Sequence, residues 1–144
     1  MRTRLLAAVA LLVVGIALPG CTEVESATVE GYEPAKLQEI EGSELKRVEF
    51  TREGAARTDV RTAPVQRSNG GLVVPYTALI YDGDGKSYVY VADEPLSFMR
   101  TDVVVDHIEG GRALLRNGPP VGSQVVTTGA AEVHGAELEI GGSH

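Results

Sequence analysis

The chain contains a single cysteine, Cys21, and its position suggests covalent chemistry. Cys21 closely follows the apolar run Leu5–Leu18, and an acidic segment begins just after it. A thiol at that boundary lies where membrane meets water and is accessible for modification. With no second cysteine, it cannot form an internal disulfide. The alternative is a stray thiol in an ordinary leader, but a free thiol in an exported protein has no evident use, so the pattern favours modification.

Residues 1–20 have the composition of a secretory signal peptide. Arg2 and Arg4 supply a positive start, and the apolar run that follows is shorter than the roughly 20 residues needed to span a bilayer. A retained N-terminal anchor is the alternative. Residues 18–21, Leu-Pro-Gly-Cys, resemble the lipobox of bacterial lipoproteins. The resemblance implies cleavage before Cys21, a diacylglycerol on its sulfur, and anchoring in the bilayer on the outer face of the cell membrane.

The charge of the chain excludes some partners. The net charge is −7, and removing residues 1–20 takes away two of the 13 basic residues but none of the 20 acidic ones. A chain this acidic is not expected to bind nucleic acid, and it offers no basic cluster for anionic lipid.

Asp82 and Asp84 lie in the segment Asp-Gly-Asp-Gly, which resembles the start of a calcium-binding loop. That loop requires glycine at its sixth position and glutamate at its twelfth. Here these positions are Ser87 and Asp93, so the calcium pattern fails. The segment instead favours a hairpin turn between two strands, at residues 78–81 and 87–93.

Other residues that could do chemistry are scattered. The three histidines, His107, His134 and His144, are too far apart for a His-x-x-x-His pair, so the sequence predicts no metal site and treats the first two as solvated. No serine lies in Gly-x-Ser-x-Gly, and the segment 118–123 lacks the lysine of a phosphate-binding loop. We therefore expect no cofactor and no enzymatic activity.

Composition divides the chain into three parts. The signal peptide (1–20) is followed by an acidic tether (21–44), in which seven glutamates and one lysine argue against a packed core. Leu37 and Ile40 allow the second half of the tether to add an edge strand. The third part, residues 45–144, is the folded domain.

Short segments rich in Val, Thr and Tyr, separated by turn residues, indicate a mainly β domain, a small β-barrel or β-roll. One or two short helical turns are expected within it. Thr51 is a predicted helix N-cap, and residues 130–135 form a second predicted turn before residues 136–140 close the domain. Pro64 predicts an edge position or a strand end for residues 59–65.

Aromatic side chains concentrate in the central part of the domain. Two interpretations stay open, because aromatic residues either anchor protein partners or pack in the core. The residues are Tyr76, Tyr81, Tyr88, Tyr90 and Phe98. Tyr88 and Tyr90 are expected to share one face of a strand, with Val89 and Val91 on the other.

Five short segments follow a pattern found in a known family. They are TREGAARTDVRTAPV (51–65), VPYTAL (74–79), YVYV (88–91), VVVDHIEGGRALL (103–115) and GPPVGSQVVTTG (118–129). Together, residues 45–138 resemble the membrane-proximal domain of periplasmic adaptor subunits, the membrane fusion proteins of efflux transporters. Where full adaptors carry lipoyl and helical-hairpin parts, this chain has only residues 66–71, so the strands on either side are expected to be neighbours.

These observations together predict a lipid-anchored extracytoplasmic accessory protein that docks onto an efflux transporter, an integral membrane permease. The five aromatic residues are the candidate partner surface. The alternative function is a free-standing cell-envelope module that binds a small ligand, a metal ion or a wall polymer.

Overall fold

A computed structural model describes residues 33–68 and 70–141 of the chain. These residues belong to one compact unit that begins at Gly31. The predicted signal peptide, Cys21 and the first part of the tether lie outside the described residues, as does His144. Within the described part, no helix is long and apolar enough to cross a membrane.

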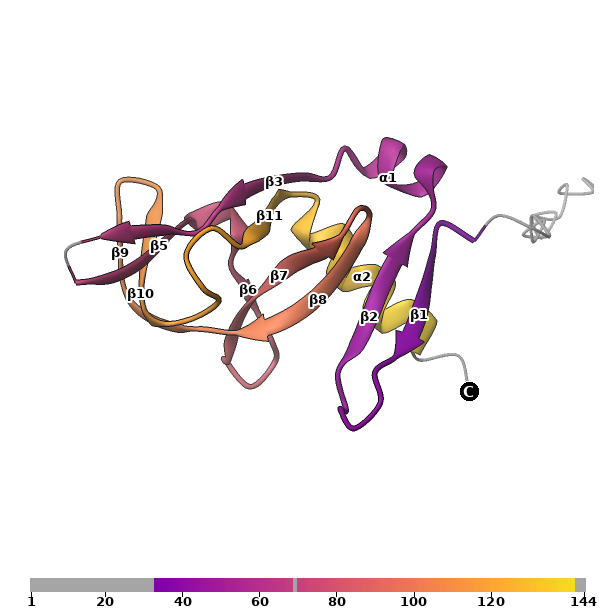
Figure 1. The fold of residues 1–144 in the computed structure, drawn as a ribbon, viewed down its shortest axis with the longest axis horizontal. Helices are drawn as coiled ribbons and strands as arrows, with labels where there is room; N and C mark the ends of the chain where they lie inside the picture. Colours follow the sequence, from indigo (N-terminus) through magenta and orange to yellow (C-terminus); the bar gives the residue numbers. More distant parts are fainter. Residues whose placement is uncertain (1–32, 69, 142–144) are drawn as a thin grey trace, which may run out of the picture. The chain divides into compact units, whose positions relative to one another are not determined.

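The described part consists of short strands and a few helical segments (Figure 1). The strands are β1 (Ala35–Glu39), β2 (Lys46–Phe50), β3 (Arg61–Pro64), β4 (Gln66–Ser68), β5 (Gly71–Pro75), β6 (Ile80–Tyr81), β7 (Ser87–Glu94), β8 (Ser97–Asp102), β9 (Val104–Glu109), β10 (Arg112–Asn117) and β11 (Gln124–Thr128). The helices are α1 (Arg52–Thr58), a 3-10 turn (Tyr76–Ala78) and α2 (Ala130–Gly141).

The strands form two antiparallel sheets. One has the order β1-β2-β8-β7-β11-β3, with β6 also paired to β7, and the other has the order β4-β5-β10-β9. The prediction of a mainly β domain is confirmed, but the closed barrel is wrong. After β3 the chain crosses into the second sheet at Val65, whose N–H donates to the Ser123 carbonyl at 2.8 Å. As predicted from Pro64, β3 is an edge strand.

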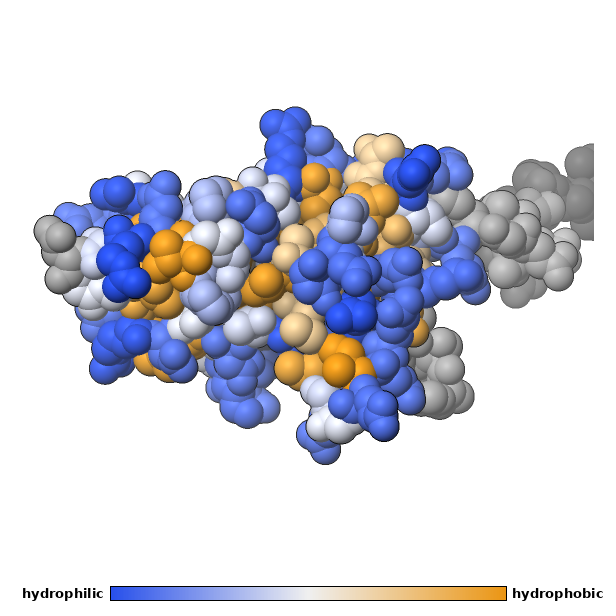
Figure 2. Space-filling model, in the orientation of Figure 1, coloured by the Kyte–Doolittle hydropathy of each residue, from blue (hydrophilic) through white to orange (hydrophobic). Residues whose placement is uncertain are grey.

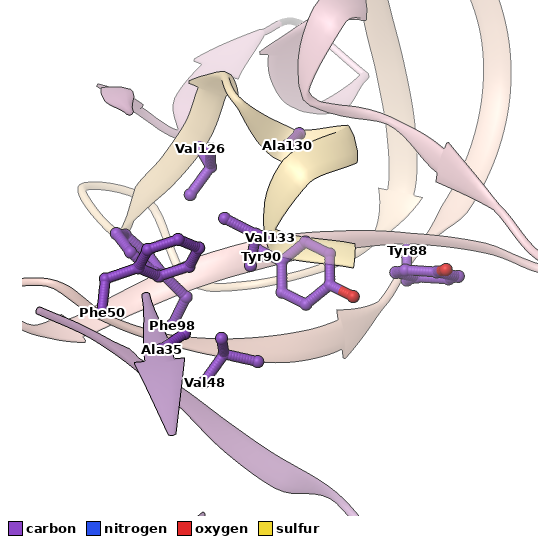
Figure 3. Packing of buried hydrophobic residues seen from close by; sticks show 9 residues of the cluster. All are labelled: Ala35, Val48, Phe50, Tyr88, Tyr90, Phe98, Val126, Ala130 and Val133. Carbon is purple, nitrogen blue, oxygen red and sulfur yellow. The ribbon is translucent and has the colours of Figure 1, made fainter. Parts of the chain in front are cut away.

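Strand β7 contributes to two separate hydrophobic cores, because neighbouring side chains point to opposite faces of a strand. The helix-side core (Figure 3) consists of Ala35, Val48, Phe50, Tyr88, Tyr90, Phe98, Val126, Ala130 and Val133. The sheet-side core consists of Val65, Val74, Ala78, Leu79, Val89, Val103, Ala113, Leu115 and Val125. The alternation of tyrosine and valine predicted for β7 is confirmed, and β11 divides in the same way between Val126 and Val125.

The segment predicted as the end of the tether belongs partly to the folded domain. β1 pairs with β2 at the edge of the larger sheet, and Leu37 packs against the helix-side core. The allowed edge strand is therefore present. The strand β1 begins ten residues before residue 45, the predicted start of the folded domain.

Helix α1 begins as predicted at Thr51, whose side-chain oxygen accepts a hydrogen bond from the Gly54 N–H at 3.0 Å. The Thr51 N–H donates to the Pro34 carbonyl, also at 3.0 Å. Gly54 is buried against this carbonyl, and a Cβ added at Gly54 would lie 2.2 Å from the Pro34 oxygen. Glycine is therefore needed where α1 meets the segment before β1.

The prediction for the C-terminal segment, residues 130–140, was wrong. In place of a single turn followed by a closing segment, residues 130–141 form one continuous helix. Gly129 has a φ of +79°, which turns the chain out of β11 into the helix. The buried residues Ala130 and Val133, three positions apart, place one helical face against the helix-side core. The helix packs on β1, β2, β6 and β7.

Two glycine substitutions test this packing. We expect Gly54→Ala to destabilise the domain by about 2 kcal/mol, because the added methyl group meets a backbone oxygen that cannot move alone. Gly135→Ala, in α2, is the matched control: its new Cβ meets nothing within 4 Å, so better helix propensity should stabilise by up to about 1 kcal/mol. Urea unfolding of both variants measures the difference, and equal effects would contradict the packing of α1 on Pro34.

Candidate functional site

The predicted aromatic surface is mostly a core. The exposed fractions of Tyr88, Tyr90 and Phe98 are only 1%, 0% and 3%, so the partner-surface interpretation is wrong for these three residues. Their side chains belong to the helix-side core, on the face of the larger sheet against which α2 packs. Tyr76 and Tyr81 each remain 47% exposed and stay candidates for a partner contact.

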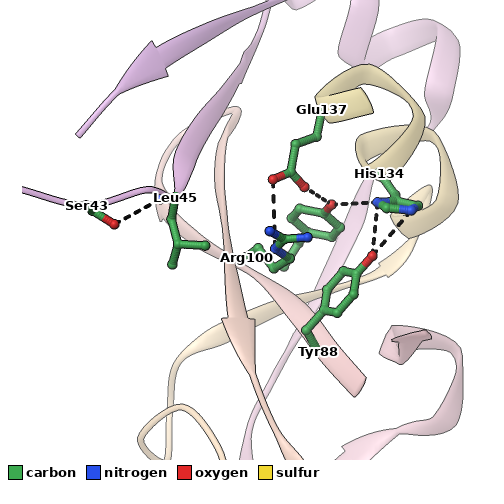
Figure 4. A network of polar contacts seen from close by, with 7 residues as sticks. Ser43, Leu45, Tyr88, Arg100, His134 and Glu137 are labelled. Carbon is green, nitrogen blue, oxygen red and sulfur yellow. Dashed lines mark hydrogen bonds and ion pairs between the residues drawn. The ribbon is translucent and has the colours of Figure 1, made fainter. Parts of the chain in front are cut away.

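Helix α2 brings His134 to the two buried tyrosines (Figure 4). The His134 Nδ1 atom lies 3.0 Å from the Tyr88 hydroxyl and 3.1 Å from the Tyr90 hydroxyl. The prediction of a solvated histidine is therefore wrong for His134. Sequence reasoning missed this contact because more than 40 residues separate the partners, and the helix that joins them was expected to be a single turn.

Glu137 and Arg100 complete the group, which we call the tyrosine–histidine cluster: Tyr88, Tyr90, Arg100, His134 and Glu137. The Tyr90 hydroxyl donates a hydrogen bond to Glu137 Oε2. Arg100 Nε lies 3.8 Å from Glu137 Oε1, and its guanidinium carbon lies 5.0 Å from the centre of the Tyr88 ring. Strand β7 supplies both tyrosines from one face, β8 supplies Arg100, and α2 supplies His134 and Glu137 three residues apart.

The hydrogen bonds constrain the protons in the cluster. Tyr90 has one hydroxyl proton and gives it to a carboxylate, which can only accept when ionised. The Tyr90 oxygen can therefore meet His134 Nδ1 only as an acceptor, which requires a proton on Nδ1. The same Nδ1–H also faces the Tyr88 oxygen, so one imidazole proton serves two phenol oxygens.

Burial keeps both phenols neutral. Burial raises the pKa of Tyr90, and the hydrogen bond and negative charge of Glu137 raise it further. Burial also raises the pKa of Tyr88, although the neighbouring Arg100 acts in the opposite direction. The side chains of Arg100 and Glu137 are 29% and 11% exposed, so the cluster reaches solvent on their side.

The other predicted residues are not brought into this cluster. Asp82 caps its own loop, since its Oδ1 accepts hydrogen bonds from the backbone N–H groups of Asp84 and Lys86. His107 lies on the exposed strand β9 beside Asp106. Among the described residues, no group of three His, Cys, Asp or Glu side chains is placed to hold a metal ion.

Two hollows on the surface of the described part are candidate ligand sites. One, of about 130 Å³, is lined mainly by apolar residues of β3, β5 and the turn before β10, with Gly111 at its edge. It is small beside the 300–1,000 Å³ typical of small-molecule sites. The other, of about 380 Å³, is lined by residues 39–46, the loop of the β1–β2 hairpin, and five of these are polar or charged. Neither hollow combines the size and the apolar lining of such a site.

The sequence matches no protein-family model and shows no significant similarity to any curated protein. The tyrosine–histidine cluster therefore has to be interpreted from its own chemistry.

The raised pKa values predict how stability responds to alkali. The folded state holds the Tyr90 proton more tightly than the unfolded chain, where the pKa is near 10. This contribution to stability is complete below pH 10 and is lost as pH rises, by up to about 1.4 kcal/mol per pH unit. Tyr90→Phe should cost about 1–3 kcal/mol at pH 7, because it leaves a buried acceptor unpaired, and should make the decline above pH 10 shallower.

Urea unfolding at pH 7 to 11 measures both effects. Tyr81→Phe is the control, since its exposed hydroxyl should leave stability at pH 7 within about 0.5 kcal/mol of the wild type. If the two variants decline in parallel above pH 10, the Tyr90 phenol is not held by the fold as described.

Proposed function

We propose that the chain is a lipid-anchored extracytoplasmic accessory protein whose β domain docks onto an integral membrane efflux transporter. The observation that carries the proposal is the short distance between the candidate lipidation site and the folded domain. About 13 residues separate Cys21 from β1, and even fully extended they span at most about 45 Å. A domain acylated at Cys21 could contact only partners close to the membrane surface.

Strand pairing supports the resemblance to membrane-proximal adaptor domains. The segments 51–65 and 118–129 are the first and the last of the five segments that follow the adaptor pattern. In the structure their strands, β3 and β11, pair with each other, with Ala63 opposite Val125. Within the short junction at residues 66–71, β4 pairs with β5, with Arg67 opposite Leu72. The strands on either side of the junction, β3 and β5, are in contact but lie in different sheets, so the support for the resemblance comes from the pairing of β3 with β11.

The surface offers a place for a protein contact. Figure 2 shows that apolar groups on one face form separate patches among hydrophilic residues. Tyr76 is the first residue of the 3-10 turn and Tyr81 is the last residue of β6. Each is about half exposed. Exposed aromatic side chains are frequent anchors of protein interfaces. A lipid-tethered domain has a high effective concentration beside a membrane protein, so a small contact would be sufficient.

The anchor is tested by mass spectrometry of the protein from its native membranes. The proposal expects the mature chain to begin at Cys21 and to carry acyl chains. Cys21→Ala should give an unacylated precursor that keeps residues 1–20. Recovery of an unmodified Cys21 thiol on the wild-type protein would contradict the anchor.

Docking is tested by pull-down in mild detergent with a C-terminal tag, comparing wild type with a form in which a cleavable, non-lipidated leader replaces residues 1–21. We expect the wild type to recover one permease in stoichiometric amount and the leader form to recover less. Tyr76→Ser should also weaken recovery, whereas Ile108→Ser, equally exposed on β9, should not. Membrane attachment without a stoichiometric partner would contradict docking.

A further inference from the structure

We propose that the apolar hollow where the two sheets meet binds an acidic segment of the transporter's extracytoplasmic surface, with one apolar side chain in the hollow and a carboxylate on Arg112. The inference rests on the proposed function, because it names the surface through which the domain docks. Three observations carry it: the size of the hollow, the charge of the surface around it, and the exposed Tyr76 beside it.

This junction hollow lies where β3, the edge strand of the larger sheet, meets β4, β5 and the start of β10 in the smaller sheet. Most of its lining is apolar and comes from Pro64, Val73, Val74 and Pro75. Its volume of about 130 Å³ is well below that of small-molecule sites, which begin near 300 Å³. One apolar side chain fits such a hollow, so a protein segment is the occupant that its size favours.

Backbone hydrogen bonds fix the walls of the junction hollow. The Tyr76 N–H donates to the Gly111 carbonyl at 2.9 Å, which ties the end of β5 to the turn before β10. At the crossing between the sheets, the Val65 N–H donates to the Ser123 carbonyl at 2.8 Å, and the Val65 carbonyl accepts from the Gly122 N–H at 2.9 Å. A pocket with fixed walls loses little conformational freedom when a partner enters it.

The hollow lies in the basic part of an acidic protein. Residues 60–81 and 103–129, which include β3, β11 and all strands of the smaller sheet, contain four arginines and two acidic residues, a net charge of +2. The other described residues, 33–59, 82–102 and 130–141, contain seven basic and 15 acidic residues, a net charge of −8. Figure 1 shows β5, β9 and β10 at the end of the domain opposite β1 and β2. A negatively charged partner is therefore attracted to the end with the hollow and repelled by the other end.

Arg112 is the charged residue of the lining, and it is available to a partner. The two acidic residues of this end already have other neighbours: Asp106 and Glu109 lie 2.9 and 4.0 Å from the ring nitrogens of His107. Arg116 Nε also lies 3.5 Å from Asp106. Arg112 is exposed and forms no ion pair within the described part of the chain, although Glu109 is its cross-strand neighbour. Its guanidinium can therefore bind a partner carboxylate through two parallel hydrogen bonds.

An anionic membrane is the other partner that a basic surface could meet. Recognition of anionic lipid takes a cluster of about four to eight Lys or Arg side chains, and the surplus at this end is two charges. The hollow instead places an apolar pocket beside Tyr76, which directly follows Pro75 of the lining and is 47% exposed. An exposed aromatic side chain next to a pocket is typical of the anchors of protein interfaces, so these features favour a protein partner.

The test is photo-crosslinking of the full-length protein in its native membranes, with a benzophenone amino acid in place of Gln66, an exposed residue of the lining. The same amino acid in place of Gln38, exposed on β1 in the acidic part, is the matched control. We expect position 66 to crosslink to an extracytoplasmic segment of one integral membrane protein, and position 38 not to do so. Mass spectrometry of the crosslinked peptide should show acidic residues next to an apolar residue.

Charge reversal tests the contact of Arg112. Combined with the probe at position 66, Arg112→Glu should lower the crosslinking yield at least about tenfold, because like charges would then face each other. Arg112→Lys should keep part of the yield, since it retains the charge but not the paired hydrogen bonds. Arg52→Glu, the same charge reversal at an exposed position of α1, should leave the yield unchanged. Near-UV circular dichroism identifies any variant that has lost the fold, and the remaining variants then decide the result.

Other results would overturn the proposal. A lipid crosslinked at position 66 would place the basic end on the membrane, and a yield that Arg112→Glu leaves unchanged would remove the carboxylate contact. If the pull-down recovers a permease but position 66 gives no crosslink, docking uses another surface, and this inference fails while the proposed function stands. If the pull-down recovers no permease and position 66 crosslinks to a protein without membrane spans, the proposed function fails as well.

Discussion

The fold depends on one strand, β7, whose two faces lie in two different cores. Tyr88 and Tyr90 face the helix-side core, while Val89 faces the sheet-side core. A shift of one residue in pairing would move every side chain to the wrong face and bury a phenol among the valines. The hairpin with β8, which keeps Val89 opposite Thr101 and Tyr90 opposite Arg100, therefore fixes the position of both cores and of the tyrosine–histidine cluster.

The cluster is a polar element inside an apolar core, and that combination has consequences. Burying two phenols, an imidazole and a carboxylate is costly unless each is hydrogen-bonded, and here each finds a partner on another element. The docking of α2 on β7 thus depends on the geometry of these hydrogen bonds as well as on the apolar area that is buried.

The sequence predicted features that depend on neighbouring residues. The alternation of tyrosine and valine predicted which side chains lie on each face of β7. Thr51 was correctly predicted as the N-cap of α1, and Pro64 correctly predicted that β3 lies at the edge of its sheet. Features that depend on distant residues were missed. Residues 130–135 were predicted as a turn and residues 136–140 as a closing segment, because the helix that they form is stabilised by distant residues, where Val133 packs against the sheet. The cluster was missed for the same reason, since no local pattern joins His134 to Tyr88. Of the predicted forms, a β-barrel or a β-roll, the closed barrel does not form, because Val65 carries the chain into a second sheet.

The central claim is that β7 joins both cores into one cooperative unit. The most direct measurement is equilibrium unfolding in urea followed by two probes at once. Near-UV circular dichroism of the buried tyrosines reports the helix-side core, and methyl NMR of Val74 and Leu115 reports the sheet-side core. Shared dependence on β7 predicts that both probes change with the same midpoint. If the methyl signals were lost at a clearly lower urea concentration while the tyrosine signal stayed intact, the smaller sheet would unfold alone. That result would contradict the claim that β7 joins the two cores.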